Sequence, residues 1–223
     1  MRPPRARLAI LASGGGSNLQ AILDHLRSLG NAAPAEVAVV ISDRAAAGAL
    51  DRARAAGILA VHLPASESHT LAALLEAQDI THIALAGYLR LIPAEVIAAF
   101  AGRIVNVHPA LLPAFGGPGM YGRHVHEAVL RAGVRVSGAT VHFVDARYDE
   151  GAIIAQWPVP VHAGDTPETL AARVLTAEHQ LYPRIVAALC AGTITLESDG
   201  TVRGAEELTS ERAAPTRPLS PDP

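Results

Sequence analysis

The residues best suited to acid–base chemistry occur together as Asn106-Val107-His108-Pro109, at the end of an apolar run. Asn106 and His108 are two positions apart, so their side chains point to the same face of a strand. An amide N–H stabilises a developing oxyanion, and an imidazole carries a proton near neutral pH. The pair predicts a site that stabilises an oxyanion at a strand end, where ligands bind in open α/β sheets. The alternative is an Asn and a His whose hydrogen bonds are all satisfied by loop backbone.

An acidic segment, Asp145-Ala146-Arg147-Tyr148-Asp149-Glu150-Gly151, supplies candidate carboxylates. No His or Cys joins it in a spacing typical of metal ligands. A carboxylate beside His108 would raise the pKa of that histidine and orient its ring. From the residues alone, a solvated acidic turn is the simpler interpretation.

A glycine-rich turn, Ser13-Gly14-Gly15-Gly16-Ser17-Asn18, lies between an apolar run and a helical pattern. Glycines let the backbone approach a ligand, and a helix N-terminus offers free N–H groups and a positive dipole end. The third glycine of the dinucleotide fingerprint is replaced by Leu19, so one phosphate fits this turn better than a pyrophosphate. The alternative is a tight turn in which Ser17 caps the helix.

Composition excludes several other chemistries. All 18 basic residues are arginines, so a Walker A loop, Schiff-base catalysis and a lysine-bound pyridoxal cofactor are excluded. The net charge of -3 gives no basic excess for nucleic acid. No apolar run approaches the ~18 residues of a membrane span. The one cysteine, Cys190, cannot form an internal disulfide, which favours a reducing compartment and predicts a cytoplasmic protein.

Short apolar runs alternate with helical patterns around these residues. Strands are predicted over Leu8–Ala12, Glu36–Ile41, Leu59–Leu63, His82–Ala86, Ile104–Val107, Ser137–Val144 and Ile153–Val161, and a small hairpin over Ile194–Val202. Helices are predicted over Ser17–Ser28, Ala45–Ala56, Thr70–Ala77, Pro93–Phe100, Gly122–Ala132 and Glu168–Leu189. We expect one α/β domain, with a Rossmann-like, mostly parallel sheet, helices on both faces and antiparallel C-terminal strands.

Three further expectations concern less regular parts. A long loop over Pro109–Arg123 is predicted to be functional. The last long helix is expected to carry Arg173 and Glu178 on a polar face. The folded domain is predicted over residues 1–203, and the polar, proline-rich residues 204–223 are predicted to be a disordered tail.

Taken together, these segments resemble a known family. LASGGGSNLQAIL, LAGYLRLIP, RIVNVHPALLPAF, GATVHFVD, YDEGAIIAQ and TAEHQLYP are similar, in this order, to the hallmark segments of the glycinamide ribonucleotide formyltransferases. The resemblance runs from about Leu8 to Thr195. The segments around His108 and Asp149 are typical of all folate-dependent formyltransferases. The glycine turn and the last segment favour the glycinamide ribonucleotide branch.

The resemblance implies a role for each matching residue. The catalytic residues would be Asn106, His108 and Asp149. The substrate, through its phosphate loop and one carboxylate, would contact Gly15, Gly16, Ser17, Asn18, Leu19 and Glu178. The folate would contact Leu89, Arg90, Leu91, Ile92, Asn106, Asp145, Ala146, Arg147, Tyr148 and Asp149. The family's usual basic residue in the folate loop is missing from Pro64–Thr70, and Gly116–Gly122 is a longer insert.

The implied reaction is transfer of a formyl group from 10-formyltetrahydrofolate, a co-substrate, to glycinamide ribonucleotide during purine synthesis, without a metal. Asn106 and a protonated His108 would stabilise the oxyanion, and Asp149 would keep His108 cationic. The expected partners are these small molecules, with no nucleic acid or membrane, and the expected state is a monomer or weak homodimer. Formylation of methionyl-tRNA, hydrolysis of the formyl folate and a non-catalytic phosphate-sugar binding module are the alternatives.

Overall fold

A computed structural model describes residues 4–206 of the chain. In this part, one seven-stranded sheet has the order β3-β2-β1-β4-β5-β6-β7. Its strands are β1 (Ala6–Leu11), β2 (Ala35–Ser42), β3 (Leu59–His62), β4 (His82–Leu85), β5 (Ile104–His108), β6 (Val136–Phe143) and β7 (Ile153–Pro160). Strands β1 to β5 pair in parallel, whereas β6 and β7 are antiparallel. The predicted α/β fold with a mostly parallel sheet and antiparallel C-terminal strands is confirmed.

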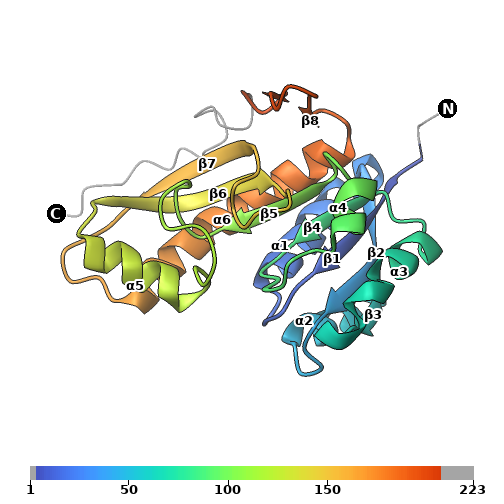
Figure 1. The fold of residues 1–223 in the computed structure, drawn as a ribbon, viewed down its shortest axis with the longest axis horizontal. Coiled ribbons are helices and arrows are strands. Elements are labelled where there is room, and N and C mark those ends of the chain that lie inside the picture. The colour runs from blue at the N-terminus through green and yellow to red at the C-terminus, as the bar shows by residue number, and fades with distance from the viewer. Residues whose placement is uncertain (1–3, 207–223) are drawn as a thin grey trace.

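Helices cover both faces of the sheet (Figure 1). They are α1 (Ser17–Leu29), α2 (Gly48–Ala55), α3 (Leu71–Ala77), α4 (Ala94–Ala99), α5 (Arg123–Ala132) and α6 (Pro167–Cys190), with short 3-10 helices η1 (Gly30–Ala32) and η2 (Ala65–Thr70). The apolar residues of α1, α2 and α6 share one core cluster, and those of α3 and α4 share another. Helix α5 packs on α6 beside β6 and β7.

The alternation of side chains along the buried strands explains the two clusters. In β1, Leu8 and Ile10 pack toward α1 and α6, whereas Ala9 and Leu11 pack toward α3 and α4. A strand covered on both faces must be apolar at every position, because successive side chains point to opposite faces. The uninterrupted apolar run predicted a buried strand at Leu8–Ala12, and the structure places this strand, β1, inside the sheet between β2 and β4.

Helix α6 fixes the two halves of the sheet to one another. Its first turn is stabilised by a capping box between Thr166 and Thr169. Tyr182 is fully buried, and its hydroxyl lies 2.9 Å from the carbonyl oxygen of Leu85 and 3.1 Å from that of Val105. These contacts attach the helix to the neighbouring strands β4 and β5.

The expectation that Glu178 lies on a polar face of this helix is wrong. The Glu178 side chain is buried against α1, because α6 packs between α1 and α5 and has little free surface there. Arg173 is half-buried and pairs with Asp165 at 2.8 Å. Helical spacing alone could not separate the two faces, since both carry polar residues.

The remaining differences are small. Helix α2 begins at Gly48, three residues later than predicted, and η2 precedes α3. The small hairpin is present as β8 (Thr195–Leu196) and β9 (Val202–Arg203). Ala205 still packs against the core, and residues 207–223 of the predicted tail lie outside the described residues. Between residues 4 and 206, no helix has the length and apolar character needed to cross a membrane.

Candidate active site

The loops that follow β1, β2 and β4 meet at the carboxyl edge of the sheet. Ser13 donates its hydroxyl hydrogen to Asp43 (2.6 Å) and accepts the Leu89 N–H (3.0 Å). The second oxygen of Asp43 accepts from Arg90 Nε at 3.2 Å. Only 3% of the Asp43 side chain is exposed. This buried carboxylate thus ties the glycine turn to the segment that follows β4.

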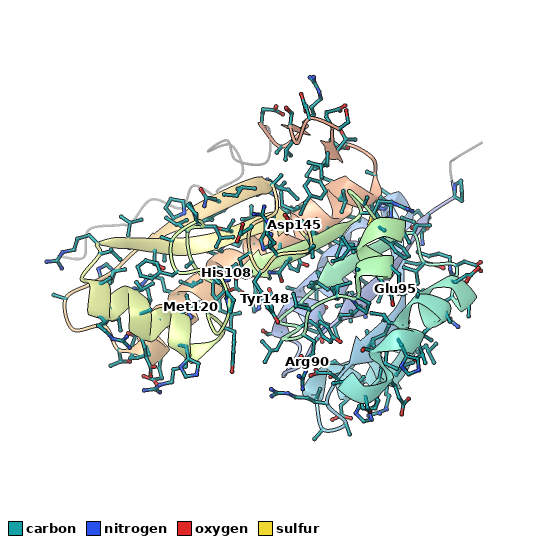
Figure 2. All side chains as sticks on the ribbon, in the orientation of Figure 1. Arg90, Glu95, His108, Met120, Asp145 and Tyr148 are labelled. Carbon is teal, nitrogen blue, oxygen red and sulfur yellow. The ribbon has the colours of Figure 1, made fainter. Side chains whose placement is uncertain are left out.

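Strand β5 delivers Asn106 and His108 to the same edge. Strand β6 runs antiparallel beside it, so that Asn106 lies opposite His142 and His108 opposite Thr140. The loop between β6 and β7 then carries Asp149 back over the end of β5. In the view of Figure 2, His108 and Tyr148 lie between Met120 on one side and Arg90 on the other.

The His108 ring has a protein partner at each nitrogen. Nε2 lies 2.8 Å from the Phe115 carbonyl oxygen, which can only accept, so Nε2 carries a hydrogen. Nδ1 lies 3.5 Å from Asp149 Oδ2. The side chain is 3% exposed. The predicted pairing of His108 with Asp149 is therefore present in the geometry.

The expectation that His108 is cationic is not supported. Burial lowers the pKa of His108 below its usual value, although the Asp149 carboxylate and the Phe115 carbonyl act in the opposite direction. The nearby His142 lowers this pKa further. The expected effect of Asp149 is real but smaller than the cost of placing a charged ring in a buried site. His108 is therefore mainly neutral at pH 7.

Asp149 is held by several groups. It has a positive φ of 57°, and its Oδ2 accepts the Gly117 N–H at 2.9 Å. Burial alone would raise the pKa of Asp149, but contacts with His142, His108 and Gly117 lower it overall. Asp149 is therefore ionised at neutral pH. The segment Asp145–Gly151 therefore places a carboxylate beside His108, which was one of the two interpretations of this segment, because β5 and β6 bring His108 and His142 from elsewhere in the chain.

His142 is a residue of this site that the sequence reasoning missed. Its Nδ1 lies 2.7 Å from the Phe143 carbonyl oxygen, so Nδ1 carries a hydrogen, and in the neutral tautomer Nε2 accepts from Asn106 Nδ2 at 3.1 Å. This bond uses one amide hydrogen of Asn106 and leaves the second for a ligand. Nε2 also lies 3.6 Å from Asp149 Oδ1. The register of β5 against β6 was the missing signal, because it pairs Asn106 with His142.

The predicted long loop spans residues 109–122 and is tied to β6 and β7. Thr140 Oγ1 donates to the Ala110 carbonyl (2.6 Å) and accepts the Leu112 N–H (3.0 Å). Gln156 Nε2 donates to the Leu112 carbonyl at 2.8 Å. These bonds fix the start of the loop. Further along, the loop places the Phe115 carbonyl beside His108 and the Gly117 N–H beside Asp149.

A cavity of about 680 Å³ opens in front of these residues. Its wall includes Leu89, Asn106, His108, Tyr148, Asp149 and Glu178 together with the end of the long loop and the first turns of α6. A smaller cavity of about 560 Å³ shares Gly117, Tyr148 and Asp149 with it. Asp149 can therefore be approached from two sides.

Glu178 joins the cavity to the glycine turn. Its Oε2 accepts from Asn18 Nδ2 at 2.6 Å. Burial raises the pKa of Glu178 to about 7, while the Asn18 hydrogen bond acts in the opposite direction. The carboxyl group is therefore poised to gain or lose a proton near neutral pH when a polar ligand approaches.

The glycine turn leads into α1, whose first backbone N–H groups have no partner within the helix. Gly16 is the N-cap residue with a φ of 76°, and no side chain caps the helix, so the alternative in which Ser17 caps it is wrong. The first helical hydrogen bond runs from the Gln20 N–H to the Gly16 carbonyl. The N–H groups of Ser17, Asn18 and Leu19 consequently have no acceptor within the helix. The Leu19 side chain is in the core, so only its backbone can meet a ligand.

The residues expected to contact folate separate into two groups. Leu89, Asn106, Tyr148 and Asp149 line the larger cavity. The others do not line it. Arg90 contacts Asp43, Leu91 is exposed and Ile92 is in the core. In the acidic loop, Asp145 is half-buried, and Ala146 and Arg147 are exposed. The segment Pro64–Thr70, which lacks the family's usual basic residue, contains η2 and an exposed His69.

Neither an activated thiol nor a metal centre is found among residues 4–206. Burial raises the pKa of the Cys190 thiol to about 12, so it is not a thiolate at neutral pH. The described part of the chain holds no group of three or more His, Cys, Asp or Glu side chains arranged to hold a metal ion. The groups that do converge are an amide, two imidazoles and a carboxylate, which suit oxyanion stabilisation and proton transfer.

Comparisons with known proteins agree with this chemistry. A family profile described as "Formyl transferase" matches residues 6–186. The phosphoribosylglycinamide formyltransferase of Vigna unguiculata, described as chloroplastic, is 45% identical over a match that covers 88% of this chain and 64% of that protein. The phosphoribosylglycinamide formyltransferase of Escherichia coli (strain K12) is 36% identical, and the match covers 86% of this chain and 91% of that protein. The chain thus spans less than two thirds of the Vigna protein.

A solved structure extends the similarity to the fold. Glycinamide ribonucleotide transformylase 1 from Symbiobacterium toebii aligns with a TM-score of 0.82 at 44% identity, covering 89% of this chain and 93% of that one.

Proposed function

The chain belongs to the formyl transferase family, and we propose that it transfers the formyl group of 10-formyltetrahydrofolate to the amine of glycinamide ribonucleotide in purine synthesis. The observation that carries the proposal is the convergence of Asn106, His108 and Asp149 on one cavity wall. Relatives named for this reaction support the choice of substrate.

The amine attacks the formyl carbon directly, so a C–N bond forms while the carbonyl oxygen becomes an oxyanion. The free amide hydrogen of Asn106, held in direction by His142, donates to this oxygen. His108 Nε2–H is the second donor. In this structure it is donated to the Phe115 carbonyl, so the formyl oxygen must replace or share that acceptor.

The attacking nitrogen then loses a proton and the folate nitrogen gains one as its bond to the formyl carbon breaks. His108 begins neutral, and its Nδ1 faces Asp149. The growing oxyanion and the Asp149 carboxylate both favour an imidazolium, so the ring accepts the proton during the reaction. The ring then gives this proton to the folate nitrogen, directly or through a water held by Asp149, as the bond from that nitrogen to the formyl carbon breaks, and the ring is neutral again. The charge on His108 thus arises during the reaction.

The substrate phosphate binds at Gly15, Gly16, Ser17, Asn18 and Leu19 through backbone N–H groups of the turn and the first turn of α1. Glu178 accepts from a polar group of the same substrate inside the cavity. The bond from Asn18 to Glu178 sets the distance between these two parts of the binding site. The folate lies against Leu89 and Tyr148, with its reacting nitrogen near Asp149.

The same proposal places the enzyme in the cytoplasm as a monomer or weak homodimer without nucleic acid or membrane partners. The single, half-buried cysteine and the arginine-only, mildly acidic composition support this. The Vigna relative is described as chloroplastic, whereas the Escherichia coli relative is bacterial. Fractionation of the native organism would test the location.

The decisive experiment is a spectrophotometric assay of tetrahydrofolate release. Purified protein with 10-formyltetrahydrofolate should release tetrahydrofolate only when glycinamide ribonucleotide is added. Release without an acceptor would show a hydrolase, and release only with methionyl-tRNA would show the tRNA-directed activity. Binding of both ligands without turnover would leave a non-catalytic binding module, and each of these results would contradict the proposal.

A further inference from the structure

The glycine turn is packed tightly against α2. A Cβ atom on Gly16 would lie 2.8 Å from the Ala49 Cα, and one on Gly48 would lie 3.3 Å from the Gly15 Cα. Such separations are shorter than or at the limit of normal contacts, so the turn has no room to move toward α2. The residues of α2 therefore define one side of the turn.

Two successive carbonyl groups of the turn point at that helix. The Gly14 carbonyl accepts the Ala49 N–H at 3.1 Å, and the Gly15 carbonyl accepts Arg52 Nε at 2.8 Å. In a planar trans peptide, the carbonyl and the next N–H point in opposite directions. The N–H groups of Gly15 and Gly16 consequently both point away from α2.

The opposite side is where the cavity lies. Helix α1 packs against α2 on one side and against α6 on the other (Figure 1). Asn18, in the first turn of α1, reaches Glu178 on the cavity wall. Asn18 is 8% exposed, and its Oδ1 has no hydrogen-bond partner among residues 4–206. The N–H groups of Gly15 and Gly16 thus point away from α2, toward the side on which Asn18 connects the turn to the cavity wall. Asn18 Oδ1 is an acceptor and does not contribute to holding a phosphate.

Arg52 contributes more than one bond to this arrangement. Its NH1 group donates to Gln20 Oε1 at 3.2 Å, so the guanidinium spans the turn and the start of α1. The segment Ser13–Asn18 itself contains no basic residue. A phosphate bound there would depend on backbone dipoles and on a cation from a neighbouring element.

We propose that Arg52 is a positioning residue for the phosphate of the substrate: it holds the Gly15 carbonyl toward α2, so that the Gly15 and Gly16 N–H groups face the phosphate. The inference rests on the proposed function, because that function supplies a substrate with a phosphate. Arg52 acts through the turn, and its positive charge adds attraction for the dianion.

The test compares Arg52→Gln with Arg54→Gln. Arg54 lies on the same helix and pairs with Asp51 at 2.7 Å, away from the turn. We expect Arg52→Gln to raise the KM for glycinamide ribonucleotide on the order of tenfold, the scale of one lost charge-assisted hydrogen bond. The KM for 10-formyltetrahydrofolate and the kcat at saturation should change less than about twofold. Arg54→Gln should match the wild type in all three constants.

A phosphate-free acceptor, glycinamide riboside, separates positioning of the phosphate from general damage. Its kcat/KM should be the same in Arg52→Gln and the wild type. An equal loss with both acceptors, or a normal KM for the ribonucleotide, would overturn the inference. If circular dichroism shows that Arg52→Gln does not fold, Arg52→Lys replaces it. Lys keeps the charge but lacks Nε, so its KM for glycinamide ribonucleotide should lie between those expected for Arg52→Gln and the wild type. A wild-type KM in Arg52→Lys would overturn the positioning role. A wild-type enzyme inactive with the ribonucleotide would instead refute the proposed function.

Discussion

The protonation of His108 is decided by two opposing effects at a single residue. Asp149 favours the imidazolium, but burial disfavours it more strongly, and the pKa of His108 falls below its usual value. A neutral ring at rest suits a group that must accept a proton during the reaction. A permanently charged ring would be a donor only. Because burial and Asp149 act on the His108 pKa in opposite directions, the rate should be sensitive to the charge of Asp149.

Asp149→Asn should lower kcat by about 100-fold, the scale of a general acid–base contribution. The same change removes the charge that raises the His108 pKa, so this pKa should fall further. Because the neutral ring is the active form, kcat/KM is full above the His108 pKa and is lost as pH falls through it. The acid limb should lie below about 6.5, the ordinary value for histidine, and should move to lower pH in Asp149→Asn.

The pH profile of kcat/KM and NMR titration of His108 check this prediction. His108→Ala should cost at least as much rate as Asp149→Asn, and the double variant should cost little more than either one, because the two groups act as a unit. Independent, multiplicative losses would contradict the paired role.

His142 provides a second prediction for a single residue. His142→Leu removes the acceptor that orients the Asn106 amide. We expect kcat to fall about tenfold, the cost of one misdirected hydrogen bond, with both KM values nearly unchanged. His142→Gln retains an acceptor oxygen and should recover part of the rate. Steady-state kinetics of the two variants decide the matter, and a wild-type kcat in His142→Leu would show that Asn106 is oriented by other contacts.

Among the elements, the turn between β1 and α1 depends most on its close contact with another element. Gly16 has a positive φ of 76°, and a Cβ there would meet the Ala49 backbone at 2.8 Å. Gly14, two residues earlier, has open space within 4 Å and no positive φ. The two glycines therefore differ in what a methyl group would do, although the sequence presents them as equivalent.

Gly16→Ala should raise the KM for glycinamide ribonucleotide about tenfold or more. The left-handed backbone alone costs roughly 1–2 kcal/mol with a Cβ, and the contact with Ala49 moves the turn. Gly14→Ala is the matched control and should retain a KM close to that of the wild type. Isothermal titration with the ribonucleotide measures the difference, and equal affinities in the two variants would contradict the assignment of the phosphate to this turn.

The whole molecule carries buried ionisable groups whose pKa values make its stability depend on pH. Burial is the largest cause that lowers the pKa of five histidines, His25, His82, His108, His126 and His179. In the unfolded chain these rings bind protons from about pH 6.5 downward. Their contribution to stability is full above that pH and is lost as pH falls, because the unfolded state then binds more protons.

Glu178 has the opposite effect on how stability depends on pH. Burial raises its pKa from 4.5 to about 7, so between these values the folded state binds the extra proton and gains stability as pH falls. The five histidines outnumber the one carboxyl group, so the Tm should fall between pH 7 and 5. In Glu178→Gln the opposing effect is absent, and the Tm should fall more steeply. Thermal melts at successive pH values test both slopes, and a Tm that rises toward pH 5 would contradict the prediction.

The sequence by itself determined the elements and several of the chemical groups. Uninterrupted apolar runs required buried parallel strands, and the spacing of Asn106 and His108 placed both on one face of β5. The glycine turn before a helical pattern required free N–H groups at a helix start. These conclusions depend on local periodicity and backbone chemistry, which a single segment already contains.

Only the tertiary structure decided which groups meet and in what state. The register of β5 against β6 places His142 in the site. The packing of α6 on α1 buries Glu178, which was expected on a polar face. Arg52, on α2, donates to the glycine turn. Each contact joins residues that lie well apart in the chain. The neutral form of His108 followed from burial, and burial is the sum of everything packed around a residue. Local sequence patterns carry neither pairing register nor total burial, so these features could not be predicted from them.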